Sequence, residues 1–482
     1  MNNYNPTMSD FLALFNLQSK DIETCSISHQ QDGIYVYVKL IATPQLCPIC
    51  GQMTSRIKEY YTKKITHSIF HNTNCYIIYS ARRYVCRRCH KTFYENNPFT
   101  MPSSNISLVT VYNILNDLKS PRETFTGVAI RYNVSPTTVT RIFDSHVHIS
   151  RRKLPEYLCL DEVYSFKSYN SKYVCVLVDF LEQKIVDVLP SRKKNDLYNY
   201  FSAIPLNERE KVKICSFDMW ESYRIICKEM FPNSVNSVDH FHMIQELNRC
   251  VDKVRIRIMN SYYKTKQNYK NIKNRTPDEE VKFKEASQHY YALKKFKWMF
   301  FKNDNRIFDP NETKMYNKVL ERYCNYYDIF EYMVNSNNDL DIAYDLKDEV
   351  IEFYKKCTYK NAEKKLNEII KDFSSSPIPE MISFSNTLKK WKYEIINSFI
   401  IVKEYTDKNN NTIKKKINNG IIENRNKSIK LLKHSSNGYL NWERFRNRIL
   451  FSLNDDATFF MYPAFKPKPT KNTSTKKENE DK

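Results

Sequence analysis

Glycine is scarce in this sequence, with 5 residues in a chain of 482, whereas soluble proteins use it at about 7% of positions. This scarcity excludes collagen-like and flexible glycine-rich chains. The five glycines also lie far apart, so neither G-x-G-x-x-G nor G-x-x-x-x-G-K-S/T occurs. Those patterns hold nucleotide phosphates in tight loops. We therefore expect no nucleotide cofactor bound in that way.

Long apolar runs are also missing. No run approaches the roughly 18 residues that a membrane-spanning helix needs. The opening MNNYNPTMSDFLALF lacks the basic start and long apolar stretch of a secretory signal. We therefore expect a cytoplasmic protein with no membrane partner. In that compartment the 13 cysteines predict reduced thiols, some of them metal ligands, rather than a disulfide framework.

Positive charge is what the chain has in excess, with 76 Lys and Arg against 54 Asp and Glu and a formal net charge of +22. Such a surplus favours a polyanionic partner, because a basic surface that binds a phosphate backbone releases counterions. Nucleic acid is the leading interpretation, although an AT-rich coding genome would also enrich lysine. The length leaves room for roughly two to four domains.

Two C-x-x-C pairs form the first metal-binding pattern. They are Cys47 with Cys50 and Cys86 with Cys89. Four thiolates suit tetrahedral Zn²⁺, and a tight turn lets each pair reach one ion. The runs between the pairs are expected to pair as strands, which gives a zinc ribbon with a structural ion. Unrelated free cysteines are the alternative interpretation, and His67, His71 and Cys75 are rival ligands with weaker spacing.

A helix-turn-helix pattern follows the cysteine module. Helical spacing covers Thr124–Tyr132 and Thr137–His146, with a break at Asn133–Pro136 between them. The outward positions of the second helix are Thr137, Thr138, Thr140 and Arg141. Short polar and arginine side chains of this kind reach base edges in the major groove. We therefore predict a DNA-recognition helix, with an ordinary helical hairpin as the alternative.

An α/β pattern runs from Tyr157 to Asp239, with elements in the order β-β-β-α-β-α-β. Asp161 lies inside one apolar strand and Asp218 ends another. A carboxylate in an apolar strand is costly unless it binds something, and aspartate-rich oxygen sites select Mg²⁺ or Mn²⁺. The pair predicts a divalent-metal site, whereas Asp218 taken alone would be a helix cap.

Three further features surround this pattern. Asp239 and His242 end the last predicted strand, where they either support the site or cap the strand. Trp220 either stacks on a base or packs in the core. From His240 to about Tyr405 the pattern is helical, and its basic faces are expected to follow DNA unless they are merely solvated. These faces include Lys253, Arg255 and Arg257.

Several motifs in this order carry a resemblance. They are LDEVYSF, VDVLPSR, SFDMWESYR, FPNSVNSVDHFHMIQELNRCVDKVR, NGIIENRNKSIK and GYLNWERFRNRIL. From the zinc knuckles to about Leu450 the chain resembles bacterial insertion-sequence transposases of the ISL3 (ISL-three) type. The resemblance implies an RNase H-like domain of the DDE class, interrupted by a helical insertion, that cuts and joins DNA at element ends.

The resemblance also implies the catalytic acids, which are Asp161, Asp218 and Glu423. Glu423 is selected by the resemblance alone, and Asn424 stands where we expect the family to have glycine. Two Mg²⁺ or Mn²⁺ ions would serve this site. The expected partners are double-stranded DNA, as element inverted repeats and as target, and further copies of the chain in a homodimer or higher oligomer. Such a protein would be nucleoid-associated.

The expected organisation is multidomain, α/β with an added α part. Its segments are a zinc-binding domain (1–100), a helix-turn-helix domain (101–152), the first part of the RNase H-like core (153–262), the helical insertion (263–412), the last part of the core (413–462) and a disordered tail (463–482). The function predicted is that of a DNA transposase. The alternatives are a DNA-binding regulator derived from a transposase and a metal-dependent DNA nuclease.

Overall fold

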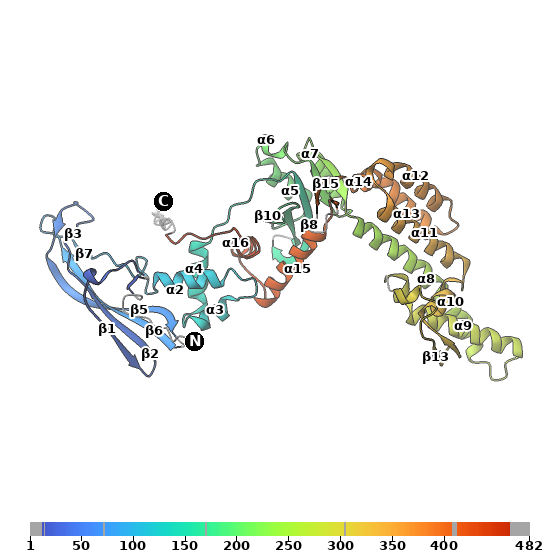
Figure 1. The fold of residues 1–482 in the computed structure, drawn as a ribbon, viewed down its shortest axis with the longest axis horizontal. Helices are drawn as coiled ribbons and strands as arrows, with labels where there is room; N and C mark the ends of the chain where they lie inside the picture. Colours follow the sequence, from blue (N-terminus) through green and yellow to red (C-terminus); the bar gives the residue numbers. More distant parts are fainter. Residues whose placement is uncertain are drawn as a thin grey trace, which may run out of the picture. The chain divides into compact units, whose positions relative to one another are not determined.

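The structure is a computed structural model that describes residues 12–13, 15–70, 73–168, 171–302, 305–406 and 412–462. The chain forms two compact units, one made of Met1–Ser150 with Ser428–Lys482 and the other of Arg151–Lys427 (Figure 1). Within the described ranges, no helix is long and apolar enough to cross a membrane. The expected disordered tail, 463–482, lies outside the described residues.

A five-stranded sheet with the order β1-β2-β6-β5, and β7 beside β6, begins the first unit. A short helix, η1 (Ser19–Asp21), precedes it, and its strands are β1 (Ile22–Gln30), β2 (Gly33–Leu40), β5 (Ile57–Phe70), β6 (Thr73–Val85) and β7 (Thr92–Tyr94). The antiparallel pairing of β5 with β6 confirms the strands predicted between the cysteine pairs. Along β6, alternate residues from Cys75 to Ala81 are buried, as expected for a strand with one face on the core.

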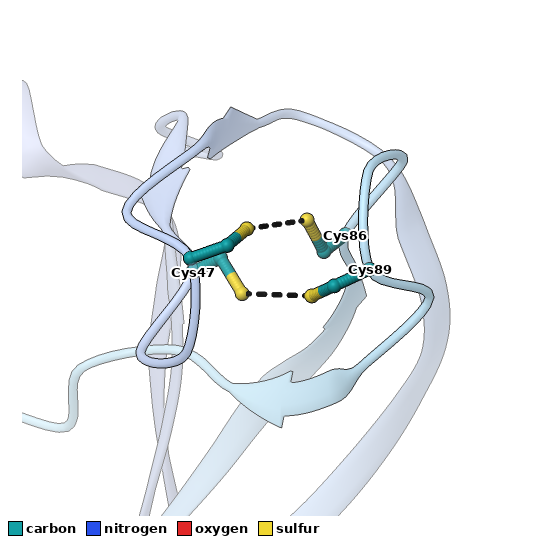
Figure 2. A group of neighbouring side chains, drawn as sticks. Cys47, Cys86 and Cys89 are labelled. Carbon is teal, nitrogen blue, oxygen red and sulfur yellow. Dashed lines mark hydrogen bonds between the residues drawn. The ribbon is translucent and has the colours of Figure 1, made fainter.

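Both cysteine pairs lie on turns at one end of this sheet (Figure 2). The turn with Cys47 and Cys50 joins β3 (Gln45–Leu46) to β4 (Met53–Thr54). The turn with Cys86 and Cys89 joins β6 to β7. Two short hairpin turns therefore present their thiols to each other.

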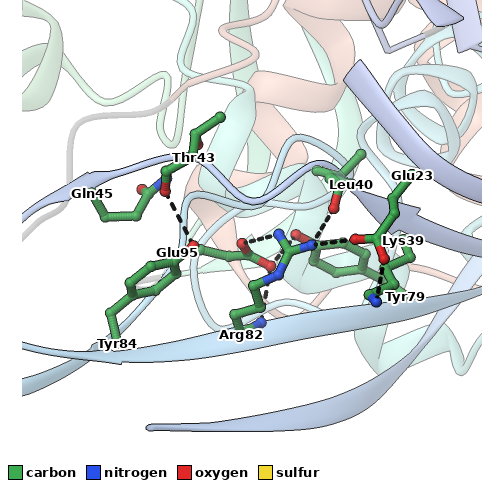
Figure 3. A network of polar contacts seen from close by, with 9 residues as sticks. All are labelled: Glu23, Lys39, Leu40, Thr43, Gln45, Tyr79, Arg82, Tyr84 and Glu95. Atoms are coloured by element: carbon green, nitrogen blue, oxygen red, sulfur yellow. Dashed lines mark hydrogen bonds and ion pairs between the residues drawn. The ribbon is translucent and has the colours of Figure 1, made fainter. Parts of the chain in front are cut away.

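A buried ion pair anchors β6 just before the second turn (Figure 3). The Arg82 side chain is 1% exposed, and its Nη1 lies 3.1 Å from Oε2 of Glu95. Oε1 of Glu95 accepts hydrogen bonds from the Arg82 backbone N–H and the Tyr79 hydroxyl. Nη2 of Arg82 contacts Glu23 and donates to the carbonyl of Leu40. The network thus ties three strands together beside the cysteines.

Three helices follow the sheet in the first unit. They are α2 (Leu108–Asp117), α3 (Phe125–Arg131) and α4 (Pro136–His146). Each is capped by the hydroxyl of the residue before it, which accepts a hydrogen bond from a backbone N–H in the first turn. The capping residues are Ser107 for α2, Thr124 for α3 and Ser135 for α4. Hydroxyl caps of this kind satisfy donors that lack an intrahelical partner. Buried apolar residues of all three helices form one cluster.

The helix α16 (Trp442–Leu453) also belongs to the first unit. Its Arg448 is 1% exposed and donates to the carbonyls of Ser120 and Glu123, between α2 and α3, at 2.9 and 2.8 Å. Arg444 pairs with Asp144 of α4 at 2.6 Å. By its contacts, the chain from Ser428 onward groups with the first unit. The domain boundaries expected from the sequence, 413–462 included, stay predictions.

The second unit contains a sheet with the order β10-β9-β8-β11-β12. Its strands are β8 (Tyr157–Ser168), β9 (Ser171–Asp179), β10 (Ile185–Leu189), β11 (Ile214–Phe217) and β12 (Val235–Val238), with helices α5 (Lys194–Ser202), α6 (Leu206–Arg209) and α7 (Glu221–Met230) between them. The strand order along the chain is the predicted one, with the short α6 as an addition. The strand of Asp161, β8, is central, and β11, which precedes Asp218, is its parallel neighbour.

A run of helices separates β12 from the end of this unit. They are α8 (His240–Lys270), α9 (Pro277–Lys295), η2 (Lys297–Phe300), η3 (Asn305–Ile307), α10 (Tyr326–Val334), α11 (Asn338–Lys356), α12 (Tyr359–Ser375), α13 (Pro379–Lys390) and α14 (Lys392–Asn397). Two hairpins accompany them, β13 (Met315–Asn317) with β14 (Arg322–Cys324) and β15 (Ile401–Thr406) with β16 (Thr412–Lys416). The last helix, α15 (Gly420–Ser435), crosses into the first unit. The helical pattern predicted after His240 is thus observed, and its apolar residues share one core with the sheet.

Two of the arginines expected to follow DNA, both on α8, bind partners on neighbouring helices instead. Arg255 is 4% exposed and donates to the carbonyl of Leu293 at 2.9 Å. Arg257 pairs with Asp339 and Glu380 at 2.9 and 3.1 Å. The DNA-tracking prediction is therefore wrong for Arg255, because a helix packed against a neighbour buries one face whatever its charge.

Removal of Glu95 should measure how much the buried ion pair contributes to the stability of the first unit. Glu95→Ala leaves the guanidinium of Arg82 buried without its main partner, so we expect the free energy of unfolding of the first unit to fall by about 3–5 kcal/mol. The matched control is Glu59→Ala, which removes the partner of the neighbouring Arg83 in an exposed pair and should change little. Urea denaturation followed by hydrogen exchange in β5 and β6 measures both, and equal losses would contradict the prediction.

Candidate active site and metal centres

The four cysteines of the two knuckles converge on one point (Figure 2). Their sulfur atoms all lie within 4.8 Å of one another. The Sγ atoms of Cys47 and Cys89 are 3.5 Å apart, as are those of Cys50 and Cys86. A tetrahedron with Zn–S bonds of about 2.3 Å has edges of about 3.8 Å. The donor set and its spacing therefore fit one zinc ion.

The two knuckles have the same backbone design. The residue after each second cysteine, Gly51 or His90, has a left-handed φ of 67° or 55°. Its N–H donates to the carbonyl of Cys47 or Cys86, at 3.0 and 3.1 Å. Backbone N–H groups, that of Cys89 first, lower the pKa of the Cys86 thiol to about 6. At Cys89 the Lys91 backbone N–H lowers the pKa of the thiol, but burial and the contacts with the other cysteines raise it to about 12. The turns thus favour the thiolate form at Cys47 and Cys86, the first cysteine of each pair.

The rival zinc ligands lie elsewhere. His67 is buried, and its Nδ1 is 2.8 Å from the Ser107 hydroxyl. Burial lowers the pKa of His67 to about 4. Cys75 is buried in the core of the N-terminal sheet. His71 lies outside the described residues. Neither His67 nor Cys75 belongs to the four-cysteine cluster.

The helices α3 and α4 meet at a sharp turn. Val128 and Ala129 of α3 share a buried cluster with Val139 and Ile142 of α4, as the sequence predicts. Asn133 in the turn has a left-handed φ of 50°, a conformation that asparagine tolerates better than most residues. The turn therefore reverses the chain without glycine.

The predicted recognition residues differ in exposure. Thr137 and Arg141 are exposed, whereas Thr138 and Thr140 are half-buried. The Thr140 hydroxyl donates to the carbonyl of Pro136 at 2.9 Å. The Thr138 hydroxyl is 2.9 Å from that of Ser135 at the helix cap. Thr137 and Arg141 are thus the two of the four whose side chains are most available to a partner.

Strand register aligns three aspartates at one edge of the second unit's sheet. In the parallel ladder, Ser216 of β11 pairs with Cys159 of β8 and with Ser237 of β12. Asp161, Asp218 and Asp239 each lie two residues beyond these partners. Since side chains alternate along a strand, residues two apart share a face. The three carboxylates therefore stand at one level on neighbouring segments.

Asp239, His242 and Glu423 form the closest group at this edge, with ligand atoms within 4.8 Å of one another. Nε2 of His242 lies 2.7 Å from Oδ1 of Asp218. Glu423 stands in the first turn of α15. The structure therefore brings Asp218, Asp239, His242 and Glu423 together, whereas the closely spaced group itself contains Glu423 but neither Asp161 nor Asp218 of the predicted trio.

Two asparagines connect the acids. The amide of Asn419, which is fully buried, donates to Oδ1 of Asp218 at 3.2 Å, and its backbone N–H donates to Asp239 at 3.3 Å. The Ser216 hydroxyl donates to Oδ1 of Asn419, which fixes the orientation of the amide. Asn426 donates to Oδ2 of Asp161 at 2.7 Å.

Neither asparagine was selected from the sequence. Asn426 lies three residues after Glu423 on α15, so the two share a helix face. That spacing is a signal that could have drawn attention to it. Asn419 begins the NGIIENRNKSIK motif, but the motif does not reveal its partners, because Ser216 and Asp218 are about 200 positions away in the chain.

Burial and like charge strain the acidic cluster. Burial raises the pKa of Asp161 to about 8, and the charge of Asp218 acts in the same direction. Burial also raises the pKa of Asp239. At His242 burial acts downward, but the contact with Asp218 and its negative charge leave the pKa above its usual value. A bound cation would relieve this strain.

Comparison with known proteins adds sequence evidence. A family model described as "Transposase", of the ISL3 type, matches residues 158–449. A second model, described as the zinc-finger of transposase IS204/IS1001/IS1096/IS1165, matches residues 43–89. The transposase for insertion sequence element IS1001 from Bordetella parapertussis is 19% identical over 417 residues, which cover 85% of this chain and 89% of that protein. The first match spans Asp161, Asp218 and Glu423, and the second spans the four cysteines.

The zinc centre should depend on both knuckles. We expect the purified chain to hold one zinc ion and Cys47→Ser or Cys86→Ser to lose most of it, because one ligand in four is removed. Elemental analysis by mass spectrometry measures the metal. Cys25→Ser is the control, since Cys25 is partly exposed and outside the cluster. Unchanged zinc in both knuckle variants would refute the assignment.

Proposed function

The chain belongs to the ISL3-type family of insertion-sequence transposases, and from this premise we propose that its acidic cluster cleaves DNA at the element ends and joins those ends to target DNA. The observation that carries the proposal is the shared register of β8, β11 and β12, which aligns Asp161 and Asp218 at one sheet edge. The contact of Asn426 with Asp161 brings α15, and with it Glu423, to the same edge.

The proposed metal ligands are Asp161, Asp218 and Glu423, and the group fits a divalent cation. Carboxylate oxygens suit Mg²⁺ or Mn²⁺. Burial and the charge of Asp218 raise the pKa of Asp161 to about 8, so a bound cation would stabilise its carboxylate form. When bound, two such ions would activate the attacking oxygen and stabilise the leaving oxygen of a phosphodiester. Among rival functions, a regulator without catalysis is not favoured, because all three acids are present.

The other residues of the cluster position the acids in this proposal. The amides of Asn419 and Asn426 hold the carboxylates of Asp218 and Asp161 by hydrogen bonds. His242 contacts the carboxylate of Asp218, with its Nε2 2.7 Å from Oδ1. Asp239 receives the backbone N–H of Asn419 and so anchors the start of α15 against the sheet. We assign Asp239 and His242 to this supporting role.

We further propose that α3 and α4 form a helix-turn-helix that reads the element ends, beside a zinc ribbon that helps to hold DNA. The buried cluster between the helices, the left-handed turn at Asn133 and the exposed Thr137 and Arg141 support this assignment. The helices between β12 and α15 are the proposed insertion into an RNase H-like core. Because an element has two ends, at least two copies of the chain would act together.

Conservative changes of the three acids should abolish chemistry but not binding. We expect Asp161→Asn, Asp218→Asn and Glu423→Gln each to lower Mg²⁺-dependent cleavage and joining of end DNA by at least about a hundredfold, since each removes an anionic group from the reacting centre. Gel-shift titration should show unchanged end binding. Glu229→Gln, an exposed acid on α7, is the control. A variant with near wild-type cleavage would exclude its acid, and cleavage without joining would favour a nuclease.

Changes on α4 should affect sequence preference. We expect Arg141→Ala and Thr137→Ala to weaken binding to the element end by about tenfold while binding to shuffled DNA changes little, because contacts with base edges carry specificity. Fluorescence anisotropy at one fixed salt concentration measures both. Arg122→Ala, an exposed arginine before α3, controls for lost charge and should weaken both DNAs alike. If Arg141→Ala behaved like this control, the recognition role would be refuted.

A further inference from the structure

A cavity of about 350 Å³ opens beside Asp218 in the second unit. The loop after β11, the first turns of α8 and the end of α13 form its walls. Its lining includes Asp218, Trp220, His242, Gln245, Thr387 and Trp391. Ligand pockets span about 300–1,000 Å³, so this one suits a small flat group rather than a large ligand. Whatever occupies it lies next to a proposed metal ligand.

Trp220 in this wall belongs to an aromatic stack. The guanidinium carbon of Arg192 lies 4.3 Å from the ring centroids of both Trp220 and Tyr173. Glu162 pairs with Arg192 and holds it in place. Trp220 itself is 40% exposed, so the core role considered for it from the sequence is wrong. Its ring is held in place before any ligand arrives, which lowers the entropy cost of binding.

The charges of the lining narrow the choice of ligand. Its three carboxylates are each paired: Glu162 with Arg192, Asp218 with His242 and Glu246 with Arg249. Because His242 and Arg249, the cationic side chains of the described lining, already face carboxylates, the cavity is poorly suited to a bare phosphate. A neutral aromatic ring could stack on Trp220, while its polar edge meets the side chains of Gln245 and Thr387. Those are the properties of a nucleobase.

We propose that this cavity receives an unstacked nucleobase adjoining the scissile phosphate of the element end. The inference rests on the proposed function, since it is the DNA cleaved at Asp218 that would supply the base. A base that leaves the duplex loses its stacking energy, and stacking on the indole of Trp220 replaces part of it. Holding the base outside the helix opens the duplex locally and presents the adjacent phosphate to the acids.

Photo-crosslinking tests binding without catalysis. End DNA carries 5-iododeoxyuridine singly at each position flanking the cleavage site and is irradiated with the full chain without added divalent metal. We expect one position to give an adduct that mass spectrometry maps to Trp220, and the adduct from that position to disappear with Trp220→Ala. If no position yields an adduct on Trp220, the proposal is overturned.

Cleavage rates provide the second readout. We expect Trp220→Ala to slow end cleavage by about tenfold, within the range measured for base stacking on aromatic side chains, and Trp220→Phe to retain most of the rate. Tyr359→Ala is the matched control, because Tyr359 is 50% exposed in the same unit and does not line the cavity. An abasic substitution at the crosslinked position should remove the difference between Trp220→Ala and the wild type.

The two hypotheses fail in different ways. If Asp161→Asn leaves cleavage intact, the proposed function is wrong, whatever Trp220 does. If Asp161→Asn abolishes cleavage while Trp220→Ala cleaves at the wild-type rate, only the base pocket is refuted. A folded Trp220→Phe variant with the rate of Trp220→Ala would contradict stacking on an aromatic ring at this position.

Discussion

The parallel register of β8, β11 and β12 is the constraint on which the rest of the second unit depends. It sets Asp161, Asp218 and Asp239 at one level, because each lies two residues beyond a set of paired positions. A slip of one residue in any strand would turn its aspartate to the opposite face. The helices behind the sheet, and the apolar core that they share with it, keep that register in place.

Such an arrangement costs folding free energy, because burial and mutual repulsion oppose the ionised form of Asp161. The structure offsets part of this cost with neutral amide donors and with the contact of His242 to Asp218. Asn419 and Asn426 donate to Asp218 and Asp161, and both come from the segment that carries Glu423. The interactions that support the acids therefore also bring the distant glutamate to them.

The two units differ in the side chains that form their polar centres. In the first unit, four cysteine thiols lie together on two similar turns, and a buried Arg82–Glu95 ion pair stabilises the sheet beside them. In the second, a small acidic centre lies in a chain with a net charge of +22. A basic chain attracts DNA over long distances, whereas only a local cluster of acids can hold divalent ions. The exposed Trp220 lines the cavity beside Asp218, one of the acids of this centre.

Local patterns determined much of this protein from sequence. Cysteine spacing predicted the zinc cluster, strand and helix periodicity predicted the order of elements from Tyr157 to Asp239, and acids in apolar strands selected Asp161 and Asp218. Each of these signals lies within a few neighbouring residues, because the periodicity of a sequence reports only on local secondary structure. Glu423 required resemblance to a family. Tertiary structure alone decided that Asn419 meets Asp218, that Arg255 is buried and that α16 joins the first unit, because these contacts link segments whose sequences carry no mark of each other.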